Sequence, residues 1–462
     1  MPVKKTIDLF LKFPEFYAAF KVQKAHRIIR LLFFFMLVVL IFEGLLGPQD
    51  PSRNFMLYLC WGLWWPGVVL SWFFVGRMWC GLCPFPELGR VFQYFHLTAG
   101  FRVPKFIVKN NMAIAMILLT AILLVEESTR MYESPRESAL LLLFILGGAT
   151  FCVLMFGKQQ WCVSCCPLGR MIGFGASISL LEFRPDHDKC RQCKTFACKK
   201  GTEDVPGCPV SLGAFNIVNS LECHVCGHCL QLCPHDSPQL RLRQPLNEII
   251  LRKGKYITCT YIIPILMGSQ LARILDQSVL SYTSKIQATC TSDVVCEMGL
   301  YLIPFVLAII LVYMIISLGD LLFGVYHDDL LGSFSPMVPV LFPVAFAGEL
   351  VHRLTFAVRN AYDFFPTVGR EFGWTSLESW TFVVPEWVYP AIALPIMMMG
   401  QIGALYVLDS MVFGEFEGLI APWRYHTIQI VFILMFAIYI SLISMSWDIE
   451  TLNVLHLLHI SI

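Results

Sequence analysis

Residues 223–234 read CHVCGHCLQLCP, four cysteines and a closing proline within one short run. The spacing Cys-x2-Cys-x2-Cys-x3-Cys-Pro is the one with which bacterial proteins hold cube-shaped [4Fe-4S] clusters. A tight loop turns the first three thiolates onto one cluster, and the proline keeps the fourth thiolate for a second cluster. Gly227 fits this loop because backbone close to a sulphide leaves little room for a side chain. The stretch therefore predicts a domain built around two clusters.

A second, looser cysteine motif at residues 190–209 supplies the partner sequence. It reads Cys-x2-Cys-x4-Cys-x9-Cys-Pro, so it keeps the Cys-Pro ending but has x4 and x9 where the strict pattern has x2 and x3. Because the fourth cysteine of each motif binds the cluster of the other motif, we expect cross-ligation. Cluster A is assigned to Cys190, Cys193, Cys198 and Cys233. Cluster B is assigned to Cys208, Cys223, Cys226 and Cys229.

Zinc is the alternative metal for these cysteines, since paired Cys-x2-Cys motifs also bind zinc. The two Cys-Pro endings favour iron–sulphur clusters. With four cysteines for each cluster, the nearby histidines have no place as ligands, and we expect them to face solvent or to donate hydrogen bonds: His224, His228 and His235. The uneven placing of the cysteines indicates metal binding in a reducing compartment rather than a secreted disulfide framework.

The chain around these motifs is strongly apolar. Of its 462 residues 56% are hydrophobic and only 15% are charged, and the mean hydropathy is +0.65. These values exceed those of a soluble domain and predict a polytopic membrane protein. A net charge of +1 provides no basic field that would gather nucleic acid, so no nucleic-acid partner is expected.

Apolar runs of about 20 residues mark the expected membrane spans. Nine runs qualify, near residues 29–46, 55–76, 111–125, 139–157, 256–275, 298–323, 333–352, 385–409 and 425–446. We therefore expect an all-α polytopic membrane protein of about nine transmembrane helices with an inserted small α+β ferredoxin domain of the bacterial two-[4Fe-4S] type. Composition shifts divide the chain into a membrane domain at 1–180, the ferredoxin domain at 181–250 and a membrane domain of about five helices at 251–462.

Lysine and arginine residues set the expected orientation. The segment before the first span carries seven of them, and residues 77–109 carry five. By the positive-inside rule both segments lie in the cytoplasm, and so does the long basic stretch 158–255. We expect a multi-pass protein of the bacterial cytoplasmic (inner) membrane, in contact with lipid, with its ferredoxin domain in the cytoplasm.

The membrane domain at 1–180 contains an internal repeat of two helical hairpins, each ending in a cysteine motif. Residues 76–84 (GRMWCGLCP) echo residues 157–167 (GKQQWCVSCCP). Repeated hairpins commonly share a site at their interface, and thiolates at helix ends are costly to bury unless metal or hydrogen bonds take their charge. We expect one four-thiolate site of Cys80, Cys83, Cys162 and Cys166, with Cys165 as an extra cysteine of the second motif. A third iron–sulphur site, a copper site, redox dithiols and a purely structural role all stay open.

With these motifs the sequence resembles the membrane-bound polyferredoxins of the NapH and NosR type, over about residues 20–250. The likeness lies in four helices, Trp-Cys-x2-Cys-Pro-like motifs after the second and fourth, and two cluster motifs. It implies an electron-transfer module between the quinone pool and a partner oxidoreductase, within a complex of redox subunits. In a related branch the module is implicated in copper reduction during cytochrome oxidase assembly. The spacing at Cys80 and Cys83 is one residue shorter than the family's usual Cys-x3-Cys-Pro, and residues 256–462 are not covered.

The C-terminal helices carry ionisable residues that are functional candidates by their place in the membrane. His352 and His426 could ligate a b-type haem axially, and Glu349 could take a proton from a quinol. Cys290 and Cys296 are expected to form a disulfide.

Three functions remain in view. No substrate-handling motif is visible, so we expect an electron-transfer subunit, linked to quinol oxidation, rather than a stand-alone enzyme. One alternative is an assembly factor that reduces copper or iron for a metal centre. The other is a redox-coupled ion-translocating subunit, with Asp320 and Glu349 as the best carboxylates for an ion path.

Overall fold

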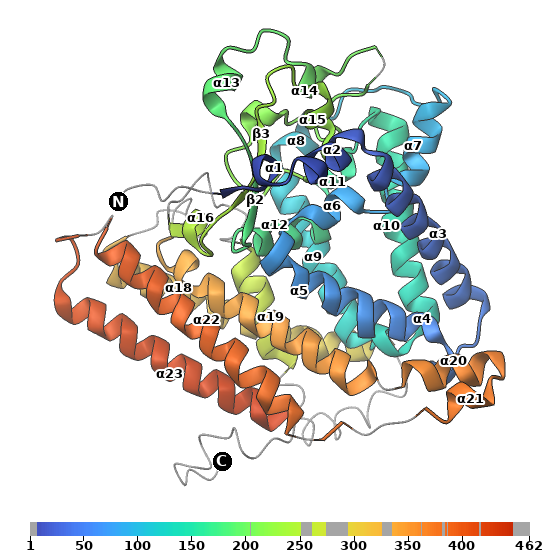
Figure 1. Cartoon of the computed structure of the whole chain (residues 1–462). Helices are drawn as coiled ribbons and strands as arrows, with labels where there is room; N and C mark the ends of the chain where they lie inside the picture. Colours follow the sequence, from blue (N-terminus) through green and yellow to red (C-terminus); the bar gives the residue numbers. More distant parts are fainter. Residues whose placement is uncertain are drawn as a thin grey trace. The chain divides into compact units, whose positions relative to one another are not determined.

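Long apolar helices make up most of the structure, a computed structural model (Figure 1). It describes residues 7–203, 205–250, 261–273, 294–325, 335–361, 363–380, 384–385, 387–414 and 417–446. The chain forms two compact units. Unit 1 consists of Met1–Met56, Gly67–Leu119 and Pro135–Gly254, and unit 2 of Leu57–Pro66, Thr120–Ser134 and Lys255–Ile462. The boundaries predicted at residues 180 and 250 stay a prediction.

Seven helices in the described residues are long and apolar enough to cross a membrane, which makes the chain a multi-pass membrane protein. They are Lys24–Leu46, Phe55–Val75, Asn111–Ser128, Pro135–Phe156, Met298–Leu322, Met337–Val358 and Val388–Val412. Two further spans were predicted. The run at 425–446 falls in a helix, α23 (Pro422–Ser446), and of the run at 256–275 the structure describes residues 261–273, which are helical.

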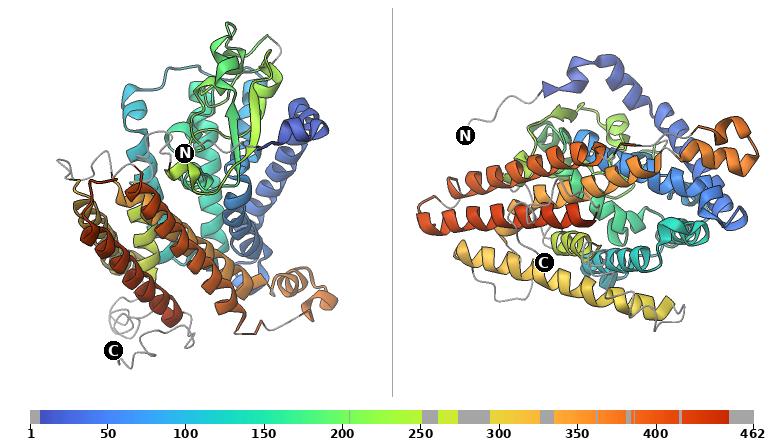
Figure 2. Two further views of the ribbon diagram at one scale, coloured as in Figure 1. Left: turned by 60° about the vertical axis from the view of Figure 1, so that its left-hand side comes forward. Right: turned by 90° about the horizontal axis from the view of Figure 1, so that it is seen from below.

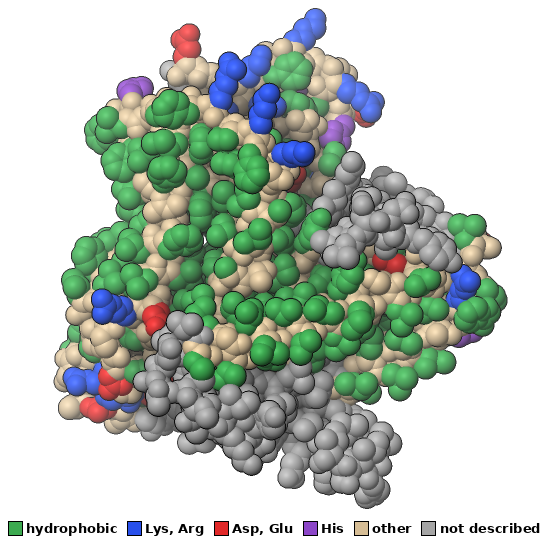
Figure 3. All heavy atoms as spheres, turned by 180° about the vertical axis from the view of Figure 1, so that it is seen from behind, with side chains coloured by type: hydrophobic (Ala, Val, Ile, Leu, Met, Phe, Trp, Pro, Cys, Tyr) green, Lys and Arg blue, Asp and Glu red, His purple; other side chains and the backbone are tan. Residues whose placement is uncertain are grey.

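The first span shows why these segments form membrane helices. Its sequence LLFFFMLVVLIF has no charged residue and is apolar on every side. Large side chains point outward from it, among them Leu32, Phe35 and Phe42, which are 62%, 70% and 60% exposed. On the face of the molecule drawn in Figure 3, hydrophobic side chains likewise cover much of the surface. Lipid contact accounts for such exposure, since apolar surface of this extent is rare on soluble monomers.

Unit 1 contains four long helices or helix parts and a cysteine-rich domain. Its elements are β1 (Ile7–Asp8), α1 (Leu9–Lys12), α2 (Pro14–Val22), α3 (Lys24–Leu46), η1 (Pro51–Arg53), the ends of α4 (Phe55–Leu57) and α5 (Trp65–Val75), α6 (Met78–Leu82), α7 (Glu87–Tyr94), α8 (Lys105–Lys109), the first part of α9 (Asn111–Ser128), α10 (Pro135–Phe156), α11 (Gln160–Ser164), α12 (Pro167–Ala176), β2 (Leu181–Pro185), α13 (His187–Arg191), α14 (Ala197–Lys200), η4 (Ala214–Asn216), α15 (His228–Leu232), β3 (Pro238–Leu242) and α16 (Asn247–Ile250).

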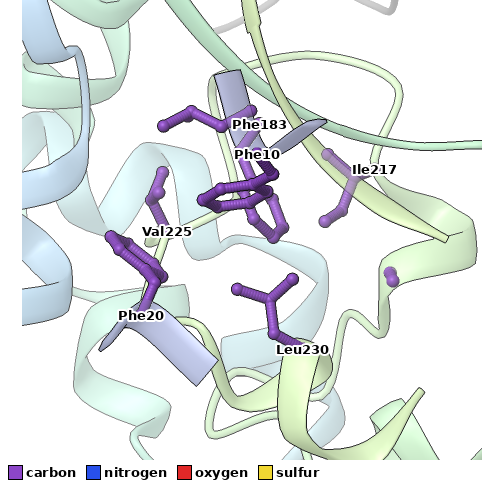
Figure 4. Close-up of a cluster of buried hydrophobic side chains, with 8 residues drawn as sticks. Phe10, Phe20, Phe183, Ile217, Val225 and Leu230 are labelled. Carbon is purple, nitrogen blue, oxygen red and sulfur yellow. The ribbon is translucent and has the colours of Figure 1, made fainter. Parts of the chain in front are cut away.

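A three-stranded antiparallel sheet organises the cysteine-rich domain, with β3 between β1 and β2. The register pairs Leu181 with Leu242 and Pro185 with Pro238. The N-terminal segment joins this domain, because β1 pairs with β3. Its aromatic side chains also enter the core, as Figure 4 shows for residues that point toward one another: Phe10, Phe20, Phe183, Ile217, Val225 and Leu230.

Helix α10 is the main packing partner of the membrane helices of unit 1 and lies against α3 and α7. Buried apolar side chains fill the contact, including Leu37 and Ile41 of α3 and Ile145 of α10. The cysteine motifs at the ends of the hairpins pack against the same apolar cluster, with Cys83, Cys162, Cys165 and Cys166 at its edge. The fold therefore positions both hairpin motifs around one core.

Unit 2 is built around α19 (Met337–Ala361), whose membrane span is 89% buried within the structure. Helix α22 (Val388–Val412) runs beside it in every view (Figures 1 and 2), and η2, a π-helix at Tyr58–Trp64, also packs on it. The remaining elements are η3 (Met131–Glu133), α18 (Val294–Leu322), α20 (Phe364–Phe372), α21 (Thr375–Glu378) and α23.

Helix α19 corrects one predicted boundary. The run at 333–352 was expected to end before Arg353, but the helix continues to Ala361. The reason is that Arg353 is 5% exposed and pairs with Glu349 one turn earlier, so its charge is neutralised inside the protein. A hydropathy profile places the end of a span at a charged residue. A helix can nevertheless continue through a charged residue that is buried and paired.

Candidate metal centre

Four cysteines of the cysteine-rich domain line one cavity of about 350 Å3, which includes space open to solvent: Cys190, Cys193, Cys198 and Cys233. These are the residues that the sequence assigns to cluster A. Ser237 lies at their edge, with its hydroxyl 3.1 Å from the Cys190 sulphur and its backbone N–H donating to the Cys233 sulphur at 3.4 Å. Hydrogen bonds of this kind to ligand sulphurs tune the potential of an iron–sulphur cluster.

The other four line a second cavity, of about 370 Å3 including open space: Cys208, Cys223, Cys226 and Cys229. They are the residues assigned to cluster B. The N–H of Val225 donates to the Cys223 sulphur at 3.4 Å. Ala214 lines both cavities, which are therefore neighbours. Cysteines far apart in the sequence are brought together in each case.

Residues in the left-handed backbone region shape the two cysteine loops. Phe196 has φ 50° between Cys193 and Cys198, while Val225 has φ 51° and Gly227 has φ 80° in the other loop. A side chain on Gly227 would collide with Gln23 and approach Phe20 of α2 to 3.1 Å. Non-glycine residues with such φ values are strained, and strain is commonly kept where a site needs a particular loop shape.

Burial makes several thiols of the two cavities poor acids. The pKa of Cys223 rises to about 12 because of desolvation, and those of Cys226, Cys229 and Cys198 rise for the same reason. The pKa of Cys193 is lowered instead, by the Thr195 hydroxyl and the N–H of Phe196. Thiolates in such places need a positive partner, which iron would supply.

The donor set fits the predicted clusters. Four cysteine thiolates are the ligand set of a [4Fe-4S] cluster, and each cavity offers four. Among the described residues, no three Cys, His, Asp or Glu side chains lie close enough together to hold a single metal ion.

The hairpin motifs bring four more thiols near one another. The pKa of Cys162 is raised by burial and then by the charges of Cys166, Cys83 and Cys80. Burial, with Cys80 next, also raises the pKa of Cys83, and burial raises that of Cys166 to about 11. The thiols of Cys80, Cys83, Cys162 and Cys166 therefore lie within electrostatic reach of each other, as expected for one shared site.

Cys165, the extra cysteine of the second motif, has different partners. Its thiol interacts with Arg170 and with Cys152 of α10. It packs at the edge of the same apolar cluster. The adjacent Cys166 instead caps the start of α12, where its sulphur accepts the N–H of Gly169 at 3.2 Å.

Arg77 connects the hairpin thiols with the second cavity. It is 3% exposed, and its Nε donates to the Cys80 sulphur at 3.4 Å. Its Nη2 lies 3.3 Å from Nε2 of His224, which must accept because arginine only donates. A side chain on Gly81 of α6 would lie 2.8 Å from the carbonyl of His224 and 3.2 Å from Cα of Cys226. The first hairpin motif thus packs directly on the backbone of the cluster B loop.

One of the two expectations for His224 is wrong, because the side chain does not face solvent. It is 4% exposed, and burial together with Arg77, Arg90 and Arg170 holds its pKa well below the ordinary value. It is therefore a neutral acceptor. The spacing of the cysteines carried no information about it, since its partner Arg77 lies 147 residues away in the sequence.

The C-terminal candidates lie in unit 2. Glu349 is 2% exposed and accepts from Arg353 Nε at 2.8 Å. His352 is half-buried on α19, and His426 is exposed on α23 with its Nδ1 3.1 Å from the Gln429 side chain. No hydrogen bond or ring contact joins the two histidines in the part of the chain that the structure describes. Cys296 is disulfide-bonded, and its expected partner Cys290 lies outside the described residues.

No family model, curated protein or solved structure matches this chain.

Proposed function

We propose that the chain is a membrane electron-transfer protein of the NapH and NosR type. In this proposal unit 1 holds two [4Fe-4S] clusters and exchanges single electrons between the quinone pool and partner redox subunits. The observation that carries it is the sorting of eight cysteines into two neighbouring four-thiol cavities. The sorting follows the cross-ligation expected for a bacterial-type ferredoxin domain.

A [4Fe-4S] cluster in each cavity would supply one-electron transfer. The residues of the chain hold and surround it. Cysteines provide the thiolates, while Ser237 and the N–H of Val225 hydrogen-bond their sulphurs. On the Cys226 side, burial raises the pKa of the thiol, and the charges of Arg90 and Arg30 offset part of that rise. Positive charge beside the cavity favours the more negative, reduced state of a bound cluster.

The contact between the hairpin thiols and the cluster B loop offers a route toward the membrane. Arg77 and Gly81 fill the space between Cys80 and the backbone at residues 224–226. Electron transfer needs short, well-packed separations, and this contact is of that kind. The proposal also places the protein in the inner membrane, with its cysteine-rich domain on the cytoplasmic side.

Anaerobic purification of the full chain, followed by iron and zinc analysis and EPR spectroscopy, tests it. Two clusters require about eight iron atoms per chain. Replacing Cys190, Cys193 and Cys198 by serine is expected to halve the iron, and Cys60→Ser, a cysteine outside both cavities, is the control. Stoichiometric zinc without iron would contradict the proposal.

A second candidate function rests on the hairpin thiols. The mutual proximity of Cys80, Cys83, Cys162 and Cys166 suits either a third iron–sulphur centre or Cu(I), which prefers thiolate ligands. Copper bound in proportion to protein, and lost in the Cys83→Ser/Cys162→Ser variant, would favour metal-centre assembly. About twelve iron atoms per chain, falling to about eight in that variant, would favour a third cluster in the electron-transfer route.

A further inference from the structure

Unit 2 contains a buried network of charged side chains from three helical segments. Its members are Glu126 and Glu127 of α9, Arg273 of the helical residues 261–273, and Glu349 and Arg353 of α19. Side chains of this kind within membrane helices are costly, and they commonly mark a binding site or a proton path. Pairing between helices explains how most of these charges are tolerated.

Arg353 donates hydrogen bonds to two carboxylates of the network. Its Nε donates to Glu349 at 2.8 Å and its Nη1 donates to Glu126 at 3.2 Å. Its guanidinium carbon lies 5.8 Å from the ring centre of Trp65, which directly follows the π-helix η2. Short π-helical segments are frequent at functional sites. Arg353 is a positioning residue that fixes both carboxylates.

Arg273 differs from Arg353 in one respect. Its Nε donates to Glu127, but Nη1 and Nη2 have no hydrogen-bond partner among the described residues. The residue is only 7% exposed. Two unpaired donors of a buried guanidinium are expensive to maintain, so the pair of N–H groups indicates an acceptor that is not part of the chain.

The surrounding charges restrict what that acceptor can be. Three carboxylates lie in the network beside two guanidinium groups, so an added anion would meet an excess of negative charge. A neutral carbonyl oxygen meets no such repulsion and accepts from both N–H groups. The carboxylates of the network and Arg353 lie on two candidate membrane spans, Asn111–Ser128 and Met337–Val358, so a ligand soluble in lipid suits the site.

We propose that Arg273 binds a carbonyl oxygen of a lipid-soluble quinone through Nη1 and Nη2. Glu127, held by Nε of the same guanidinium, lies beside that position to accept a hydrogen bond from the hydroxyl of the reduced form. This inference rests on the proposed exchange with the quinone pool and assigns it a site. Glu349, the residue expected from the sequence, is already bound to Arg353 and takes a supporting part.

Equilibrium binding of a decyl-substituted benzoquinone to the iron-loaded full chain in detergent tests the assignment. Quinones quench tryptophan fluorescence, and Trp65 lies beside the network, so Trp65→Phe is expected to reduce the amplitude of the quenching. Arg273→Gln should weaken binding about tenfold or more. Because this variant leaves Glu127 unpaired, Arg273→Gln/Glu127→Gln removes both charges and keeps the test valid if the single variant does not fold.

Arg370→Gln is the matched control, since Arg370 pairs with Asp363 in the same unit and outside the network. It should bind the quinone like the unaltered chain. Unchanged binding by the double variant, in a sample with full iron content and an unaltered elution volume, would overturn the inference. So would displacement of the quinone by equimolar palmitate, which would reveal an anion site. Loss of iron from the unaltered chain would instead count against the proposed function.

Discussion

At the scale of single residues, Arg77 is the side chain on which the first unit depends most. It is buried between a hairpin thiol and the neutral ring of His224, which is flanked by two cysteines of the second cavity. Its charge is too far from solvent to be screened effectively. It therefore acts directly on the hairpin thiols and contacts the second cavity through His224.

Replacing Arg77 by glutamine is expected to lower the midpoint potential of the cluster at Cys223 and Cys226 by on the order of 60 mV, since about one decade of equilibrium corresponds to that shift for one electron. The loss of positive charge makes the reduced state less favourable. A redox titration followed by EPR measures it. Arg102→Gln, an exposed arginine of the same unit, should leave the potential in place. A shift in both variants would show that the effect is not local.

Gly227→Ala is expected to destabilise the second cavity and reduce its iron content. The backbone has φ 80°, and a Cβ atom would displace the Gln23 side-chain amide and lie 3.1 Å from the Phe20 ring. Strain alone costs about 1 kcal/mol. Gly100→Ala is the control for strain alone, because its φ is 65° and no atom lies within 4 Å of the added carbon. Equal iron content in the two variants would contradict the role of the close contact.

The grouping of the cysteines could be predicted at this scale, because the Cys-Pro spacing indicates which four cysteines share each predicted cluster. The grouping around each cavity follows that spacing. Arg77 and His224 could not be predicted, since nothing local distinguishes a buried arginine from one at a cytoplasmic helix end. The Cys-x3-Cys-Pro spacing already set Cys165 apart from Cys166, and the start of α12 at Cys166 gives the two adjacent thiols different partners.

At the scale of elements, a buried ionic network ties β2, β3 and α12 together. Glu248 of α16 accepts from Arg184 of β2 at 2.6 Å and from the Ser220 N–H at 2.7 Å, and it also pairs with Arg243. Arg243 in turn donates to the carbonyl of Ala176 at the end of α12, at 2.6 Å. One end of the helix that begins at Cys166 is therefore fixed to the sheet.

Glu248→Ala should lower the stability of unit 1 by about 3 kcal/mol, because two buried arginines lose their nearer carboxylate and keep only Glu182, at 3.5 Å from each. Thermal unfolding of the iron-loaded chain in detergent, followed through the cluster absorbance, measures this. Asp188→Asn breaks an exposed pair with Arg191 and is expected to change little. Equal unfolding temperatures of the two variants would show that the ionic network does not stabilise unit 1.

The elements themselves were predictable to different degrees. Long apolar spans follow from hydropathy, and the described ones begin and end within a few residues of the expected positions, α19 excepted. The two-residue strand β1 and the short helices α1 and α2 were not expected to join the cysteine-rich domain. Their sequence lacks the alternation of polar and apolar residues that predicts a strand. They join the domain only through tertiary contacts with β3 and with the core around Phe183.

At the scale of the whole molecule, the two units differ in what stabilises them. The cysteine-rich part of unit 1 has a small aromatic and aliphatic core between two thiol-lined cavities. Unit 2 has a long central helix and an ionic network between helices. Hydropathy predicted the spans of unit 2, but the pairing of charges from different helices is invisible to it.

Removing iron with a chelator under oxidising conditions is expected to unfold the cysteine-rich domain and to leave unit 2 helical, because ligand binding and folding are coupled in small metal-dependent domains. Limited proteolysis should then cut first within residues 186–237. The iron-loaded chain, treated with the same protease, serves as the reference. First cuts within α19 or α22 would contradict this order.

The pairing of β1 with β3 also has a consequence for biosynthesis. Residues 7–8 leave the ribosome early, yet their strand partners are Arg241 and Leu242. At about 5–20 residues per second, roughly 10–50 s separate the synthesis of the two strands. During that interval four apolar segments have already been made, and Phe10 and Phe20 have no core to enter. Sheet closure is thus a late event, and a nascent chain stalled before residue 238 should lack the sheet.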